Sequence, residues 1–214
     1  MKRPASTAPL RHYCQQHTTP PHPVLREVER SAGLYTLSPQ MVSGSVQGQL
    51  LAMMSRMLRP ERVLEVGTFV GYGAICLAQG LAPGGQVHTL EVNDELAYLI
   101  RRNLAAAQLT ASVTLHLGDA ARLLPTFPDR YFQLAFLDAG KRDYPQHYEL
   151  VLPKLRAGGF LLIDNVLWGD KVVGAASDTD TVLLRQFNAA VQADGRVDNV
   201  LLPLRDGLLV VRKR

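Results

Sequence analysis

The chain has 214 residues, of which 47% are hydrophobic and 20% charged, with a formal net charge of +4 at pH 7. These proportions are ordinary for a soluble globular protein, and the length fits one domain. No apolar stretch approaches the roughly 20 residues that cross a bilayer, and no apolar run follows Lys2 and Arg3 to form a secretory signal. Cys14 and Cys76 are too few for a disulfide framework, so we expect a cytoplasmic protein without a membrane partner.

The N-terminal region is rich in Pro, Thr and His over residues 1–23, which predicts an irregular arm. A short helix is expected over residues 24–32, ended by Gly33. Apolar residues then recur at helical spacing, which predicts a longer helix over residues 46–58, ended by Pro60.

Strands and helices alternate along the rest of the chain. Apolar runs bounded by turn residues predict strands at 62–67, 86–92, 112–117, 132–137 and 160–163. The segments between and after them predict helices at 72–79, 94–108, 120–124, 144–155 and 181–192. Gly158 and Gly159 are expected to end the helix at 144–155. This alternation is typical of a doubly wound parallel sheet with helices on both faces.

The C-terminus breaks the alternation. Two further predicted strands, 197–204 and 208–212, are joined only by residues 205–207. A connection this short makes an antiparallel hairpin, because parallel strands need a long crossover. We therefore expect an α/β fold whose doubly wound, mostly parallel, seven-stranded sheet ends in a C-terminal antiparallel hairpin.

Two of the predicted strands end in acid. Asp138 follows the strand 132–137, and Asp164 with Asn165 follows the strand 160–163. Ligands of open α/β sheets collect at the carboxyl ends of the strands, and two carboxylates with an amide oxygen suit a hard divalent cation. Lys141 lies three residues after Asp138, so a proton acceptor is expected beside the cation.

A glycine-rich turn follows the first predicted strand, with Glu65, Gly67, Gly71 and Gly73 in the spacing E-x-G-x-x-x-G-x-G. Glycine permits a tight turn and close approach of the backbone to a ligand, and the following helix N-terminus offers free N–H groups to an anion. The spacing differs from the G-x-G-x-x-G of pyrophosphate sites, so a dinucleotide is disfavoured.

The next two strand ends also carry acids. Glu91 lies where an acid binds ribose hydroxyls in such folds, and Asp119 is placed to accept a hydrogen bond from an adenine amino group. Either acid alone can be a helix cap. In register with Glu65 and Gly67, they favour an adenosine site, and adenosine without pyrophosphate points to S-adenosylmethionine (SAM).

Four segments carry a family resemblance: residues 41–44 with 48–49, 64–67 with 71–72, 137–141, and 163–168. From about residue 34 to the C-terminus, the chain resembles the cation-dependent class I SAM-dependent O-methyltransferases, the catechol and caffeoyl-CoA O-methyltransferases. The resemblance implies a Rossmann-like methyltransferase domain over residues 34–214. Residues 1–33 then form the N-terminal arm and helix, where relatives build substrate contacts and often a dimer interface, and a homodimer is expected.

The resemblance also assigns roles to residues. The implied cofactor-binding residues are Met41, Ser43, Glu65, Gly67, Gly71, Gly73, Glu91, Asp119, Ala120 and Asp138. Within this set, Met41 and Ser43 line the methionine end of SAM. Glu65 and Gly67 hold its amino acid portion. Glu91 takes the ribose, and Asp119 with Ala120 takes the adenine.

The same resemblance implies a metal site and a general base. Asp138, Asp164 and Asn165 match the metal ligands of the family, and Lys141 matches its general base. Mg²⁺ is expected for these oxygen ligands, and Ca²⁺ or Mn²⁺ would also fit. A cation that binds both oxygens of a catechol lowers the first hydroxyl pKa and fixes its geometry. The same cation disfavours the ammonium form of Lys141.

The chain departs from the family pattern at two positions. Gly73 stands where many members have a Ser that binds the cofactor carboxylate, so backbone N–H groups or Ser43 are expected to replace that contact. Gly140 stands where plant relatives often have Asp, which changes the local loop. Neither departure removes a metal ligand.

We therefore expect a SAM-dependent and divalent-metal-dependent O-methyltransferase that acts on a vicinal dihydroxy aromatic of the catechol or hydroxycinnamate type. A tRNA hydroxyuridine O-methyltransferase of the same family is an alternative, because the chain is basic. A non-catalytic nucleotide-binding module and an NAD-linked reductase are further alternatives. Trp168 either walls the substrate or packs its loop, and His88, His116 and His147 are expected to pack rather than to bind metal.

Overall fold

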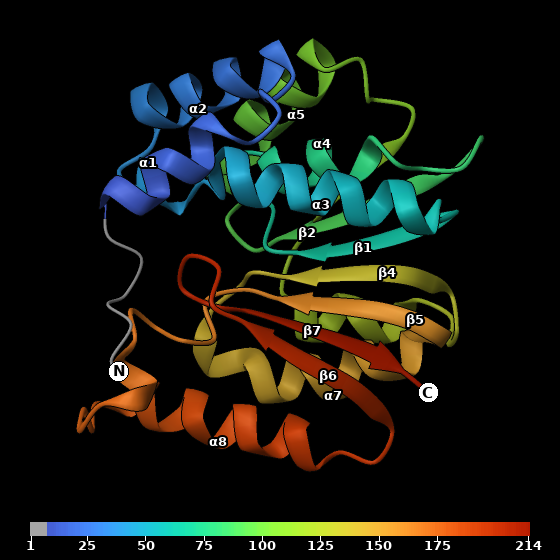
Figure 1. Ribbon diagram of the computed structural model, residues 1–214. Coiled ribbons are helices and arrows are strands. Elements are labelled where there is room, and N and C mark those ends of the chain that lie inside the picture. The colour runs from blue at the N-terminus through green and yellow to red at the C-terminus, as the bar shows by residue number, and fades with distance from the viewer. Residues whose placement is uncertain (1–7) are drawn as a thin grey trace.

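The computed structural model describes residues 8–214, and the first seven residues of the predicted arm lie outside the described part (Figure 1). Its centre is one seven-stranded sheet with the order β3-β2-β1-β4-β5-β7-β6. The strands are β1 (Arg62–Val66), β2 (Gln86–Glu91), β3 (Val113–Leu117), β4 (Phe132–Leu137), β5 (Leu155–Ile163), β6 (Val197–Leu202) and β7 (Leu208–Lys213). β1 to β5 pair in parallel, and β7 pairs antiparallel with both β5 and β6. The predicted fold class is confirmed.

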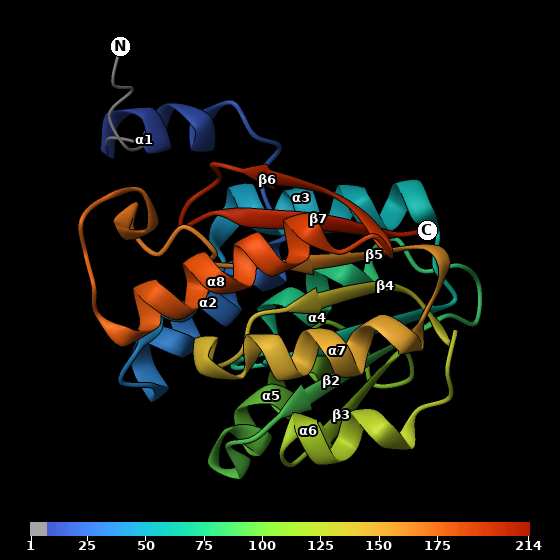
Figure 2. The ribbon, with the colours of Figure 1, turned by 90° about the horizontal axis from the view of Figure 1, so that it is seen from below.

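Helices cover both faces of the sheet, as Figures 1 and 2 show from two directions. One face carries α2 (Pro23–Tyr35), α3 (Gly44–Leu58), α4 (Tyr72–Ala78) and α5 (Ala97–Ala106). The other carries α6 (Ala120–Leu123), α7 (Tyr144–Lys154) and α8 (Thr179–Ala193). Each face has its own hydrophobic cluster, because alternate strand residues point to opposite sides of the sheet. None of the helices in residues 8–214 is long and apolar enough to span a membrane.

The N-terminal region is more helical than predicted. Helix α1 (Ala8–Gln16) lies within the segment expected to be irregular, and it packs against α3. Helix α2 continues through Gly33, the expected stop, to Tyr35. A single glycine costs a helix only about 1 kcal/mol, and the buried side chains of Val24, Leu25 and Val28 outweigh that cost by packing into the core.

The boundary between α7 and β5 also differs from the prediction. The helix ends at Lys154, and β5 begins at Leu155, before the two glycines that were expected to end the helix. Gly158 and Gly159 lie inside the strand, where the pairing of β4 with β5 shifts register. A side chain at Gly159 would crowd backbone oxygens of its own and the neighbouring strand. The glycines therefore form a strand irregularity rather than a helix stop.

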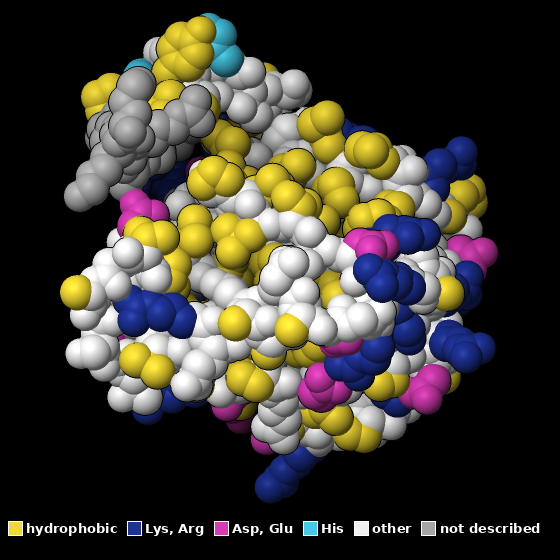
Figure 3. Space-filling view, turned by 60° about the horizontal axis from the view of Figure 1, so that its bottom comes forward, with side chains coloured by type: hydrophobic (Ala, Val, Ile, Leu, Met, Phe, Trp, Pro, Cys, Tyr) yellow, Lys and Arg dark blue, Asp and Glu magenta, His cyan; other side chains and the backbone are white. Residues whose placement is uncertain are grey.

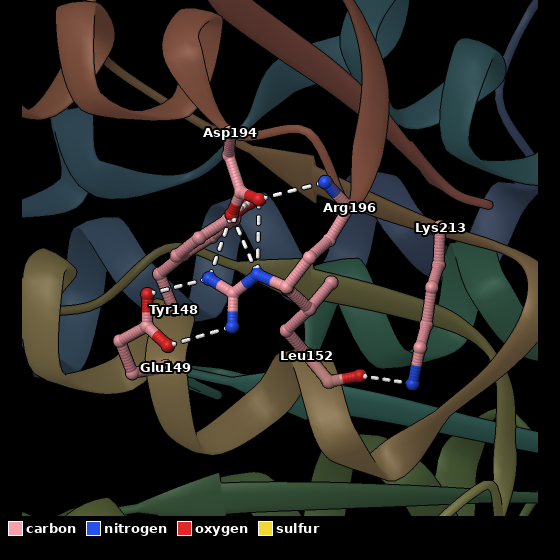
Figure 4. Close-up of polar contacts among 6 residues, drawn as sticks. All are labelled: Tyr148, Glu149, Leu152, Asp194, Arg196 and Lys213. Atoms are coloured by element: carbon pink, nitrogen blue, oxygen red, sulfur yellow. Dashed lines mark hydrogen bonds and ion pairs between the residues drawn. The ribbon is translucent and has the colours of Figure 1, made fainter.

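Polar contacts tie α7 to the turn before β6 and to β7 (Figure 4). The Arg196 guanidinium donates to Asp194 and to Glu149 of α7, both at 2.7 Å, and the Tyr148 hydroxyl donates to Asp194 at 2.8 Å. These bonds hold the pKa of Asp194 well below its ordinary value. Lys213 of β7 donates to the Leu152 carbonyl at the end of α7. The hairpin thereby fixes the helix whose N-terminus begins beside the acidic strand ends.

Apolar side chains remain exposed on several elements, among them Leu10 and Tyr13 of α1, Met53 and Met57 of α3, and Val200 of β6. In Figure 3, hydrophobic side chains gather across the middle of the face shown, and Lys and Arg gather toward its right-hand edge. An apolar face of this kind is typical of a protein contact. The expected homodimer stays a prediction.

Two histidines, one on β2 and one on β3, pack against each other. His88 Nδ1 and His116 Nε2 are 3.1 Å apart on adjacent strands, and the Phe127 ring lies against both imidazoles. Burial lowers the pKa of both side chains, and that of His88 falls to about 4, with the charges of His116 and Arg62 as smaller causes. Both imidazoles are therefore neutral in the folded protein at pH 7.

This arrangement predicts acid sensitivity. In the unfolded chain His88 binds a proton below its ordinary pKa of 6.5, whereas in the folded protein it stays neutral until about pH 4. The packing of neutral His88 therefore contributes fully to the free energy of unfolding above pH 6.5, and this contribution is lost as the pH falls toward 4. We expect His88→Gln, which keeps a hydrogen-bonding side chain but does not titrate, to lose less unfolding free energy than wild type between pH 7 and 5 in urea denaturation. An equal loss in both proteins would contradict the assignment.

Candidate active site

A cavity of about 1250 Å³ opens at the carboxyl ends of the parallel strands and is closed on one side by the segment between α2 and α3. The structure brings nearly all the predicted site residues to its wall: Met41, Ser43, Glu65, Gly67, Gly73, Glu91, Asp119, Ala120, Asp138, Lys141, Asp164 and Asn165. Gly71 does not line the cavity. It caps α4 with φ +87°, and a side chain there would face Ile100 and Leu104 of α5, so its role is to turn the backbone.

Gly67 marks the closest approach of two backbone segments. Its φ is +99°, and a Cβ atom at this position would collide with the Asp138 carbonyl oxygen. Backbone hydrogen bonds hold the contact, from Gly67 N to Leu90 O at 3.0 Å and from Asp138 N to Val66 O at 2.9 Å. The glycine-rich turn and the acidic end of β4 are therefore positioned by each other.

Glu65 and Gly73 form a second close pair. The Glu65 side chain points into the space that a Cβ atom at Gly73 would occupy, and its Oε2 accepts from Thr89 Oγ1 at 2.5 Å. Burial raises the pKa of Glu65 to about 8, with the charges of Asp138 and Glu91 adding to the rise and the Thr89 hydrogen bond opposing it. Gly73 is thus the residue that admits this carboxyl, and a Ser in its place would force Glu65 to move.

Glu91 braces the loops after β1 and β2. Its Oε2 accepts from Phe69 N at 2.7 Å and its Oε1 from Asn93 N at 2.9 Å. Phe69 has a left-handed backbone with φ +51°, which this bond helps to hold. The carboxylate lines the cavity with both oxygens engaged, so its remaining lone pairs are the ones that face a ligand.

Asp119 caps α6 by accepting from Ala121 N at 2.8 Å. Asp119 can cap the helix and also line the cavity, because only one of its carboxylate oxygens takes part in the cap. Across the cavity, Met41 is exposed at the rim and Ser43 is buried at the start of α3. The Ser43 carbonyl accepts from the guanidinium of Arg205, a cavity-lining residue that sequence reasoning missed.

Lys141 follows Asp138 in the short 3-10 helix η4 (Lys141–Asp143). Its Nζ lies 3.0 Å from Asp138 Oδ1, 3.0 Å from the Ala139 carbonyl oxygen and 2.8 Å from the Tyr144 hydroxyl. Lys141 therefore lies beside Asp138, where the sequence placed it. Three oxygen atoms hold the ammonium at one place at the cavity wall.

Tyr144 was predicted only as the start of a helix, but it joins the two acidic strand ends. Its buried hydroxyl accepts from Lys141 and donates to the Asp164 backbone oxygen at 2.9 Å. Burial raises its pKa well above the ordinary value, and the charges of Asp138 and Asp164 add to this, so the hydroxyl stays protonated. The spacing of Lys141 and Tyr144, one helical turn apart, was the available signal.

Asp164 is 2% exposed, and each of its carboxylate oxygens has one donor. Gln47 Nε2 donates to Oδ2 at 2.7 Å, and Asn165 N donates to Oδ1 at 2.8 Å. Burial and the charge of Asp138 raise the pKa of Asp164 to about 6, while these two bonds and Arg205 lower it. Gln47 was also missed. Its signal was a polar residue one turn before Leu51, on the buried face of the helix.

The predicted metal ligands fit a hard divalent cation by their chemistry. Within residues 8–214, no three His, Cys, Asp or Glu side chains cluster as a metal site; the predicted set consists of two carboxylates and the amide of Asn165. Asp138 and Asp164 repel each other in a partly buried place, and a bound cation would relieve that repulsion. Metal binding stays a prediction.

Sequence comparison finds relatives over nearly the whole chain. A family model described as O-methyltransferase matches residues 15–214. Catechol O-methyltransferase domain-containing protein 1 of Mus musculus is 35% identical over 98% of this chain and 82% of its own length. Catechol O-methyltransferase of Mycobacterium tuberculosis is 32% identical over 69% of this chain and 67% of its own length.

Solved structures share the fold. A SAH-bound methyltransferase from Podospora anserina has a TM-score of 0.90 and 25% identity, covering 100% of this chain and 98% of its own. An O-methyltransferase from Bacillus cereus in complex with SAH has a TM-score of 0.84 and 27% identity, covering 95% of this chain and 96% of its own.

The contact at Gly67 yields a test with a matched control. Gly84 also has a positive φ, of +73°, but a Cβ atom there meets nothing within 4 Å. We expect Gly84→Ala to cost about 1–2 kcal/mol of unfolding free energy, the ordinary cost of a left-handed side chain. Gly67→Ala should cost clearly more, because the added Cβ also displaces the end of β4. Equal costs in chemical denaturation would show that the contact with Asp138 is unimportant.

Proposed function

The chain belongs to the O-methyltransferase family and is a SAM-dependent O-methyltransferase. We propose that it methylates one hydroxyl of a vicinal dihydroxy aromatic with the help of a divalent cation. One observation carries the proposal: a single cavity joins the strand ends that carry Glu91 and Asp119, assigned here to adenosine, to the group formed by Asp138, Lys141 and Asp164. A donor of the methyl group and an acceptor can therefore meet in the same space.

The cofactor end supplies a carboxyl group suited to an ammonium. Glu65 is buried beside Gly67 and has a pKa raised to about 8. A cationic amino group placed next to it favours the carboxylate form. We assign Glu65 to the amino group of SAM, Glu91 to its ribose and Asp119 with Ala120 to its adenine.

The acceptor end is suited to an aromatic ring. Tyr35, Leu37 and Met41 are exposed apolar side chains that line the cavity mouth, and Trp168 lines it from the side of β5. Trp168 also packs against the hydrophobic cluster of α7 and α8, and from this fixed position it can wall the acceptor. These side chains give a flat acceptor an apolar wall and exclude water from its ring.

The chemical step requires that the acceptor hydroxyl lose its proton. We assign that proton to Lys141 Nζ, which lies beside the Ala139 carbonyl and the Tyr144 hydroxyl at the cavity wall. To accept the proton, Lys141 must be the neutral amine, and a cation held by Asp138 would favour that form over the ammonium. Asp138, Asp164 and Asn165 would hold Mg²⁺, or Ca²⁺ or Mn²⁺ in its place. When bound, the cation lowers the pKa of the hydroxyl and orients both catechol oxygens.

Chelation tests the proposal. We expect the purified protein to methylate 4-methylcatechol with SAM and Mg²⁺, and excess EDTA to abolish turnover. Lys141→Met should lower kcat by about 100-fold or more, as removal of a general base does, while SAH still binds. Full turnover in EDTA would remove the metal from the mechanism. Methylation of a tRNA hydroxyuridine with none of a catechol would favour the alternative substrate.

Glu65 yields a second test, on both stability and binding. A buried carboxyl with a pKa of about 8 penalises the fold increasingly as the pH rises from 4.5 to 8, since only the unfolded chain ionises freely. We expect Glu65→Gln to raise the unfolding free energy at pH 7 by up to about 3 kcal/mol, and to weaken SAM binding.

Calorimetry in buffers of different ionisation enthalpy checks the same assignment in the wild type. SAM binding at pH 7 should release a proton, and the release should disappear in Glu65→Gln. A variant that binds SAM as tightly as wild type, with the same proton release, would place the amino group elsewhere.

A further inference from the structure

Among the residues that the structure describes, three cationic side chains line the cavity, and they differ in whether a carboxylate pairs with them. Lys141 pairs with Asp138, and Arg142 pairs with Asp180 at 2.8 Å. Arg205 forms no ion pair with any carboxylate in residues 8–214. One exposed positive charge therefore faces the cavity without neutralisation.

The Arg205 side chain is held in place by hydrogen bonds that engage only some of its N–H donors. Its guanidinium donates to the backbone oxygens of Ser43 and Val42, the latter at 3.2 Å, which leaves further N–H groups free. The loop that carries it is anchored, because Leu167 N donates to Asp206 O at 2.7 Å. Arg205 lines the cavity together with Asp164, at the acceptor end.

The backbone at Arg205 favours glycine. Its φ is +51°, a left-handed conformation that costs a residue with a long side chain about 1–2 kcal/mol. Strained residues of this kind cluster at functional sites, where the side chain has a use. The hydrogen bonds to Val42 and Ser43 are one use, and the unneutralised charge indicates another.

We propose that Arg205 recognises a carboxylate on the ring of the acceptor, so that the preferred substrates are acidic catechols. This inference rests on the proposed function. An anionic acceptor entering this end of the cavity meets Asp164 and Asp206 and is repelled by them. A guanidinium offers a carboxylate two parallel N–H donors and offsets that repulsion.

The test compares an acid with a neutral catechol of similar shape. The quantity measured is the ratio of kcat/KM for 3,4-dihydroxybenzoate to kcat/KM for 4-methylcatechol. We expect wild type to favour the acid, and Arg205→Gly to lower the ratio about tenfold or more, the effect of losing one hydrogen bond to a charged group. Arg205→Lys should fall between them. Rising salt should raise KM for the acid in wild type more than for the neutral catechol.

Arg156→Gly is the control, because Arg156 pairs with Glu61 at 3.5 Å far from the cavity, and the ratio should stay at the wild-type value. Arg205→Gly relieves the left-handed backbone, so it is expected to fold. An equal fall of kcat/KM for both substrates would mean that Arg205 only joins its loop to Val42 and Ser43, and an unchanged ratio would also overturn the proposal.

If wild type methylates neither catechol, the proposed function fails. Calorimetric binding of the two compounds to the SAH-loaded protein then decides, and equal affinities would refute acid recognition.

Discussion

The site depends on the repulsion between two carboxylates at the ends of adjacent parallel strands. Leu137 of β4 pairs with Ile163 of β5, so Asp138 and Asp164 follow side by side where the strands leave the sheet. Burial and the charge of Asp138 raise the pKa of Asp164 to about 6. Nearly every polar contact nearby opposes this repulsion, and a cation placed between the two acids would oppose it most strongly.

The contacts that oppose it come from α3, from the 3-10 helix after Asp138 and from the start of α7. Gln47 reaches Asp164 from α3, Lys141 reaches Asp138 from η4, and Tyr144 connects the Lys141 ammonium to the Asp164 backbone. α7, which begins at Tyr144, is fixed in turn by Arg196, in the turn before β6, and by Lys213 of β7. β7 also pairs with β5, so the hairpin contacts both the strand that ends before Asp164 and the helix that begins at Tyr144.

The sequence was sufficient to predict the sheet, because strand and helix patterns alternate regularly and a three-residue connection permits only a hairpin. It placed Asp138, Asp164 and Asn165 at one rim, because parallel strands share a carboxyl edge. It failed where tertiary packing overrides local signals: α2 passes through Gly33, and Gly158 lies inside a strand. Cavity residues such as Gln47 were missed because their role depends on contacts with residues more than 100 positions away along the chain. A local sequence pattern does not show contacts at such a separation.

The most direct measurement is a crystal structure of the protein with SAH and Mn²⁺, using the anomalous signal of manganese. We expect one strong peak bound by oxygens of Asp138, Asp164 and Asn165, with Lys141 beside it, and loss of that peak in Asp164→Ala. A well-occupied SAH with no manganese between these residues, or manganese bound elsewhere in the cavity, would contradict the claim that the acid pair exists to hold a cation.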